Sequence, residues 1–178
     1  FQSGLTSSRT RASLKRQLRF VEQEIERLQK AIEEHIDNDP DLKEDAELLT
    51  SIPGLGPITA ARFLAEVNVA NFQQASQVAA YAGLVPKQET SGTSVRKRAS
   101  LSKVGNRHLR NAFFMPALSA HRFNPVIDAL VSRLAERGKH KMVIIGAVMR
   151  KLIHLAFGVL KTRKPFDPHH LEHAQIEG

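Results

Sequence analysis

Cysteine is absent from the 178 residues of this chain, and acidic residues are scarce relative to basic ones. Without thiols the chain cannot form disulfides, thiolate zinc sites or a cysteine nucleophile. Lys and Arg together number 26 against 18 Asp and Glu, which gives a net charge of +8. A basic surplus of this size favours a polyanionic partner, although ribosomal and other basic proteins share it.

A long uninterrupted apolar run is also missing. The most apolar stretch, residues 142–160, contains Arg150, Lys151 and His154, so we expect no membrane span. The length and the 42% hydrophobic content suit one sizeable domain, or a small domain plus an arm. The chain begins with Phe1 rather than methionine, so we interpret residues 1–4 as a tag remnant and expect a part of a longer protein.

Residues 5–38 form the first predicted unit, a long helical arm. Its apolar residues alternate in spacings of four and three, which is the a/d seam of a coiled coil. Such a stripe has to be buried, either against another copy of the chain or against another helix of the same chain. We favour coiled-coil pairing, and therefore a homodimer or a higher oligomer. The seam consists of Leu14, Leu18, Val21, Ile25, Leu28 and Ile32.

Residues 42–163 form the second predicted unit, a helical bundle, so the expected fold class is all-α with a long N-terminal coiled-coil helix. Strand signals are weak except for a short piece near residues 93–98. Apart from the first two helices, we expect helices over residues 74–82, 103–121, 125–137 and 141–161, with Pro116 kinking the second of these. Residues 164–178 form a polar tail that we expect to be disordered.

The segment Ile-Pro-Gly-Leu-Gly-Pro at residues 52–57 joins two stretches with helical apolar spacing, over about 43–51 and 57–67. Pro53 ends the first helix because proline disfavours the α conformation in the residue before it, and Pro57 suits the first turn of the next helix. The glycines between them permit a sharp turn and a close approach to a phosphate. Free N–H groups at the start of a helix bind anions.

This arrangement resembles the helix-hairpin-helix module of DNA-handling proteins. The alternative is a tight turn between two helices that binds no ligand. The residues predicted to hold phosphate are Gly54, Gly56 and Thr59.

A strongly basic stretch lies between residues 87 and 110, with seven Lys and Arg opposed by one acid, Glu89. Cations of this density match a phosphate backbone, and such binding depends on salt. The intervening Ser, Thr and Gly suit backbone contact more than base stacking, while an ordinary solvated loop is the alternative. The predicted nucleic-acid-binding residues of this stretch are Lys87, Arg96, Lys97, Arg98, Lys103, Arg107 and Arg110.

Ser91 lies in the same stretch, next to a glycine and near several arginines. Its hydroxyl could attack a phosphodiester if a base or a metal removed its proton and cations stabilised the transition state. No local histidine and aspartate pair is visible, so the residues alone favour an ordinary loop serine. Four other hydroxyls are alternative nucleophiles, although packing explains the single tyrosine better: Tyr81, Ser94, Ser100 and Ser102.

Three blocks together resemble the C-terminal domain of insertion-sequence transposases of the Piv type, insertion sequence family 110. The blocks are residues 52–57, residues 81–86 (Tyr-Ala-Gly-Leu-Val-Pro) followed by Ser91-Gly92, and residues 102–106 (Ser-Lys-Val-Gly-Asn) followed by Leu109-Arg110. Their order and spacing agree, and the resemblance covers more than half of the chain.

The resemblance implies a C-terminal part of a bacterial, cytoplasmic enzyme that exchanges DNA strands. The serine of the Ser-Gly block, Ser91 here, is then the nucleophile and forms a transient phosphoserine link to DNA. The family also has an N-terminal RNase H-like domain, which this chain lacks and which holds Mg²⁺ on a DEDD set of acidic residues. A structured non-coding RNA is an expected further partner. We therefore expect this chain to bind nucleic acid without recombining it alone.

Three interpretations stay open. The chain is part of a transposase or site-specific recombinase, or it is a non-catalytic helix-hairpin-helix adaptor that binds DNA or RNA and has no need of Ser91. The third is a scaffold whose arm and basic face serve protein assembly, without salt-sensitive binding to nucleic acid. The histidines His169, His170 and His173 have the spacing of metal ligands, but they lie in the polar tail. We predict no metal site and no cofactor within this chain.

Overall fold

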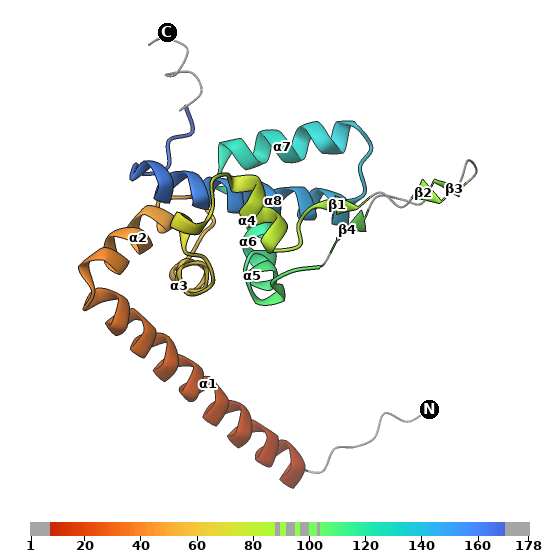
Figure 1. Ribbon diagram of the computed structural model, residues 1–178. Coiled ribbons are helices and arrows are strands. Elements are labelled where there is room, and N and C mark those ends of the chain that lie inside the picture. The colour runs from red at the N-terminus through yellow and green to blue at the C-terminus, as the bar shows by residue number, and fades with distance from the viewer. Residues whose placement is uncertain (1–7, 88–89, 92–94, 97–99, 103, 170–178) are drawn as a thin grey trace, which may run out of the picture.

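The computed structural model describes residues 8–87, 90–91, 95–96, 100–102 and 104–169. It confirms the all-α fold class, because the only strands in those residues are two residues long and lie on one extension from the helical body (Figure 1). The elements are α1 (Ser8–Asp37), α2 (Pro40–Thr50), α3 (Pro57–Glu66), η1 (Val69–Asn71), α4 (Ala75–Tyr81), β1 (Pro86–Lys87), β2 (Thr90–Ser91), β3 (Val95–Arg96), β4 (Ser100–Leu101), α5 (Arg107–Ala112), α6 (Phe114–Ser119), η2 (Ala120–Arg122), α7 (Pro125–Glu136) and α8 (Lys141–Thr162).

Helix α8 is the centre of the body. It contacts α2, α4, α6 and α7, and nine of its residues are buried, among them Leu152 and Ile153. By length and composition α8 could cross a membrane, with a mean hydropathy of 1.9 over its most apolar window, but half of that window is buried inside the protein. Burial against four helices of the same chain accounts for its apolar character.

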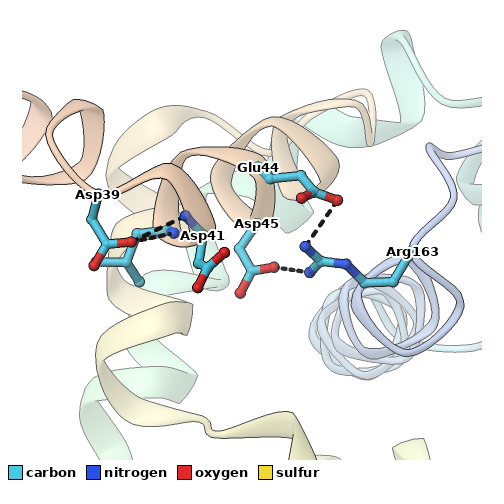
Figure 2. Close-up of polar contacts among 6 residues, drawn as sticks. Asp39, Asp41, Glu44, Asp45 and Arg163 are labelled. Carbon is cyan, nitrogen blue, oxygen red and sulfur yellow. Dashed lines mark hydrogen bonds and ion pairs between the residues drawn. The ribbon is translucent and has the colours of Figure 1, made fainter.

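Capping residues explain where two helices begin. The Asp39 carboxylate accepts hydrogen bonds from the N–H groups of Asp41 at 3.0 Å and Leu42 at 3.1 Å, directly before α2 (Figure 2). Asn124 does the same before α7, where its Oδ1 accepts from Val126 at 3.1 Å. Each cap is followed by proline at the first helical position, where a missing N–H costs nothing. The start of α7 at residue 125 was predicted, whereas α2 begins at Pro40, three residues before the expected start at about residue 43.

The prediction of one helix over residues 103–121 with a kink at Pro116 was wrong. The helix begins only at Arg107, where the Oδ1 of Asn106 accepts from the N–H of Leu109 at 2.9 Å. It then breaks at Phe113, whose backbone lies at φ −88° and ψ −4°, and continues as α6 and η2. Proline explains the position of the break, because Pro116 has no N–H for the carbonyl one turn earlier and its ring crowds that carbonyl.

The arm α1 projects from the body and meets it on the side of α2 and α3 (Figure 1). The six residues of the predicted seam are exposed in the single chain, with exposed fractions between 48% and 58%. Near the body, Leu28, Ile32 and Ile36 of α1 face Ile58 and Ala65 of α3 across a groove of about 680 Å³. Packing within the chain therefore leaves most of the stripe uncovered.

The last residue of the predicted bundle and the first residues of the predicted tail are attached to the body. Arg163, at φ +55° after α8, pairs with Asp45 and with Glu44, the latter at 2.9 Å (Figure 2). The hydrogen bond to Asp45 raises the pKa of the guanidinium above its ordinary value. The N–H of Phe166 donates to the Ser51 Oγ at 2.8 Å, and its ring packs against the core. The expected disorder is thus wrong for this part of the tail, and residues 170–178 lie outside the described residues.

Candidate nucleic-acid interface

A tight turn joins α2 to α3, as the two prolines and two glycines predicted. Ile52 and Leu55 are buried at its two sides, and the N–H of Leu55 donates to the carbonyl of Ile52 at 3.0 Å. Gly56 is the N-cap of α3, and its carbonyl accepts from the N–H of Thr59 at 3.0 Å. The turn thus brings the start of α3 to the edge of the body.

The three residues predicted to hold phosphate have different surroundings. Gly54 has φ +101°, and a Cβ on it would lie 2.8 Å from the Cβ of Ala120 in η2. Gly54 therefore permits close packing of the turn on η2. Thr59 is buried, whereas a Cβ on Gly56 would meet nothing within 4 Å. Of the three, Gly56 is the one whose Cβ direction is open to a ligand.

The turn is held against η2 and the residue after it. The Nδ2 of Asn124 donates to the carbonyl of Pro53 at 3.3 Å, which places η2 and Phe123 beside the turn. Phe123 is 66% exposed, and its neighbour Arg122 is exposed as well. Sequence analysis missed these two residues. Their only signal was an arginine and an aromatic residue directly before the Asn-Pro cap of α7.

The basic stretch forms an extension with two antiparallel strand pairs. In the pair nearer the body β1 lies opposite β4, with Pro86 opposite Leu101, and farther out β2 lies opposite β3 (Figure 1). The weak strand signal near residues 93–98 is thus confirmed in part, because β3 covers Val95–Arg96. The strands are two residues long, which is too short for a clear alternating pattern.

The backbone of Ser91 lies on β2 opposite Val95, and that of Arg96 lies on β3 opposite Thr90. Lys87 pairs with Ser100 at the base of the extension. Four other predicted residues of this stretch lie outside the described residues: Ser94, Lys97, Arg98 and Lys103.

The two arginines of α5 differ. Arg107 is exposed at the first position of the helix. Arg110 is partly buried, and its Nη1 donates to the carbonyl of Ala82 at 3.0 Å. Arg110 therefore holds the body together, in addition to any contact with a ligand.

Tyr81, the alternative nucleophile, belongs to a packing cluster. Its ring lies 5.9 Å from that of Phe72, measured between ring centres, and its hydroxyl accepts from the Nδ2 of Asn106 at 3.1 Å. Neither contact includes a base that could take the hydroxyl proton. Packing thus explains Tyr81.

The described residues include no group of three or more His, Asp or Glu side chains that could hold a metal ion. The acidic residues drawn in Figure 2 have other partners, because Asp39 caps α2 and Glu44 pairs with Arg163.

Comparison with known proteins identifies the family. Residues 46–132 match the family model described as the Transposase IS116/IS110/IS902 family. The chain is 37% identical over 153 residues to the pilin gene-inverting protein of Moraxella bovis, covering 84% of the chain and 47% of that relative. The chain belongs to this transposase family. The resemblance inferred from the three sequence blocks is confirmed.

Two further relatives of this transposase domain come from Streptomyces coelicolor. The uncharacterized 43.6 kDa protein of insertion element IS110 is 34% identical over 115 residues, covering 64% of the chain and 28% of the relative. The mini-circle putative transposase for IS117 is 33% identical over 127 residues, covering 69% of the chain and 30% of the relative. The chain spans about half the length of the Moraxella relatives and corresponds to a C-terminal part of them.

Proposed function

We propose that this transposase-family chain is the nucleic-acid-handling part of a DNA transposase or site-specific recombinase. The observation that supports it best is the placement of Ser91 on a basic extension rooted in the family-matched body. The pilin gene-inverting protein of Moraxella bovis is named for a DNA inversion, which is a strand-exchange reaction. A net charge of +8 supports a polyanionic substrate.

In the proposed reaction the Oγ of Ser91 attacks a DNA phosphorus. An Oγ–P bond forms, the bond from phosphorus to a deoxyribose oxygen breaks, and the freed deoxyribose hydroxyl takes a proton. The proton of Ser91 leaves to a base outside this chain, since the family resemblance implies acidic residues and Mg²⁺ in another domain. The basic side chains of the extension stabilise the charge that develops on the phosphate.

The turn at residues 53–57 is proposed to act as a helix-hairpin-helix phosphate clamp. The open side of Gly56 at the start of α3 allows a phosphate to approach the backbone N–H groups. Arg122 and Phe123 beside the turn add a cation and an aromatic face. We propose DNA as the principal ligand and a structured non-coding RNA as a second one.

The nucleophile is tested by Ser91→Ala in the whole protein that contains this chain, with Ser94→Ala as the matched control. We expect Ser91→Ala to abolish strand exchange and the covalent protein–DNA adduct, while Ser94→Ala retains both. Duplex DNA binding by the chain itself should weaken steeply with salt in both variants. Strand exchange that survives Ser91→Ala would favour the non-catalytic adaptor instead.

The arm is proposed to pair with a second copy of the chain, which would hold two DNA ends together. Its stripe is exposed and the groove beside α3 continues it toward the body. Replacing Leu18 and Ile25 with glutamate should convert a dimer into a monomer in sedimentation experiments, because charge in an a/d seam is not tolerated. Sedimentation as a monomer by the unaltered chain at high concentration would reject the pairing.

A further inference from the structure

The root of the basic extension is attached to α3 through one side chain. Asn106 donates from its Nδ2 to the Glu66 Oε2 at 2.6 Å and to the Tyr81 hydroxyl at 3.1 Å. Its backbone N–H donates to the carbonyl of Tyr81 at 2.7 Å, and its Oδ1 caps α5. We call Asn106, Glu66 and Tyr81 the Asn106 bridge. It joins the end of α3, the end of α4 and the start of α5.

The residue before the bridge has a backbone that only glycine supports easily. Gly105 has φ +136°, and a Cβ on it would lie 2.3 Å from the carbonyl oxygen of Tyr81. This backbone carbonyl is held by the N–H of Asn106 and cannot move aside as the end of a flexible side chain can. Gly105 and Asn106 of the third sequence block therefore act as one unit that docks on the second block, residues 81–86.

Further bonds hold the two chain segments that lead into and out of the extension. Arg110 donates to the carbonyl of Ala82, and Arg150 of α8 donates to that of Leu84 at 3.3 Å. The N–H of Ser102 donates to the carbonyl of Val85 at 2.9 Å. Both segments are thus fixed to the body or to each other where they join the strand pair of β1 and β4.

Helix α3 connects this root to the proposed phosphate clamp. It starts at Pro57, after the N-cap Gly56, and ends at Glu66, the acceptor in the Asn106 bridge. Ten helical residues span about 15 Å along the helix axis. One rigid element therefore has the clamp at its start and the root of the Ser91 extension at its end.

We propose that Asn106 is a positioning residue for Ser91. By tying the root of the extension to Glu66, it sets the separation between a DNA strand bound at Gly56 and β2, the strand that carries Ser91. This inference rests on the proposed function for its purpose, while the geometry that it predicts can be measured without any reaction. Asparagine is required because its Oδ1 caps α5 while its Nδ2 donates to a carboxylate, and aspartate can do only the first.

The absence of cysteine allows a direct test in this chain. Spin labels on Ile58→Cys, next to the clamp, and Val95→Cys, opposite Ser91, report the distance distribution between clamp and extension. We expect Asn106→Asp to broaden this distribution at least twofold, because two carboxylates then repel each other. Adding Glu66→Gln should restore the original width, since the glutamine amide can donate to Asp at position 106. Glu66→Gln alone should leave the width unchanged.

Two outcomes would overturn the inference. One is an unchanged width in Asn106→Asp, and the other is a broadening that Glu66→Gln fails to reverse while the melting temperature falls, which indicates a merely structural residue. In the whole protein, Asn106→Asp should lower strand exchange at least tenfold with DNA affinity kept within twofold, and Glu66→Gln should rescue it. If Ser91→Ala leaves strand exchange intact, the proposed function fails, while the spin-label distances still decide the role of Asn106.

Discussion

Helices α1 and α8 are both long and both carry a clear apolar stripe, yet their environments differ. Helix α8 buries nine residues against four helices of the same chain. Helix α1 is eight residues longer, 30 against 22, but its six seam residues are all exposed. An apolar stripe therefore shows that a helix needs a partner, and it leaves open whether that partner belongs to the same chain.

The width of the stripe accounts for part of the difference. Apolar residues surround most of α8, which suits a helix enclosed by neighbours on several sides. In α1 most of them occupy the narrow a and d positions, and charged or polar residues fill most of the others. A narrow seam matches one neighbouring helix.

The largest expected effect is on α8. Replacing Leu152 with alanine should lower the free energy of unfolding by about 2–5 kcal/mol, because it leaves a cavity in the core. The matched change in the arm, Leu18→Ala, should alter it by no more than about 0.5 kcal/mol in dilute protein. Urea denaturation at low protein concentration measures both. Equal losses would show that α1 is stabilised within the single chain.

The same contrast between a packed and an open position recurs in the turn between α2 and α3. Gly54→Ala should cost about 1–3 kcal/mol, because φ is +101° and the new Cβ would lie 2.8 Å from Ala120. Gly56→Ala should cost less than about 1 kcal/mol, since Gly56 has open space around it. Thermal unfolding measures the loss of packing at Gly54, and a DNA titration measures the proposed phosphate contact at Gly56.

In the DNA titration the order of the two variants should reverse. A methyl group on Gly56 would occupy the proposed path of a phosphate, so Gly56→Ala should weaken binding to duplex DNA more than Gly54→Ala does. A Gly56→Ala variant with unchanged affinity would reject the phosphate clamp at this turn.

The smallest expected effect concerns His154 of α8. Its Nε2 is buried, and in the described structure no hydrogen-bond partner reaches it. Burial, and then the nearby charges of Arg150 and Lys151, lower the pKa of the imidazole below its ordinary value of 6.5. The folded protein therefore binds this proton less readily than the unfolded chain, so His154 reduces stability progressively as the pH falls below about 6.5.

His154→Leu should flatten that decline and leave stability above pH 7 equal or slightly higher, because an unsatisfied polar atom is removed. His35→Gln, at an exposed position of α1, is the control. Melting temperatures between pH 5 and pH 8 provide the measurement. A slope that His154→Leu leaves unchanged would contradict the assignment.

Most of the helices could be predicted because their signals are local. The cap Asn124 before a proline predicted the start of α7, and the prolines and glycines of residues 53–57 predicted the turn. Helix α2 was expected from about residue 43, but its cap Asp39 and Pro40 set an earlier start. The break at Phe113 was missed, since the effect of Pro116 falls one turn before the proline itself. The family could be recognised because the three blocks keep their order and spacing.

The candidate site was harder to predict from sequence. Gly54 and Arg110 were assigned to nucleic acid, but both make internal contacts, with Ala120 and with the carbonyl of Ala82. Phe123 was missed because nothing in the sequence places it beside the turn. Whether a glycine or an arginine faces a ligand depends on what packs against it, and that neighbour is distant in the chain.

The sequence by itself determined the all-helical class, the main helix boundaries, the basic character of residues 87–110 and the family, because these depend on local spacing and composition. Only the tertiary structure decided that α8 is enclosed while the seam of α1 is exposed, and that Asn106 joins the ends of α3 and α4 to the start of α5. Such contacts join residues that are distant in the chain, 40 positions apart for Asn106 and Glu66 and 115 for Phe166 and Ser51, so they follow from how the helices pack.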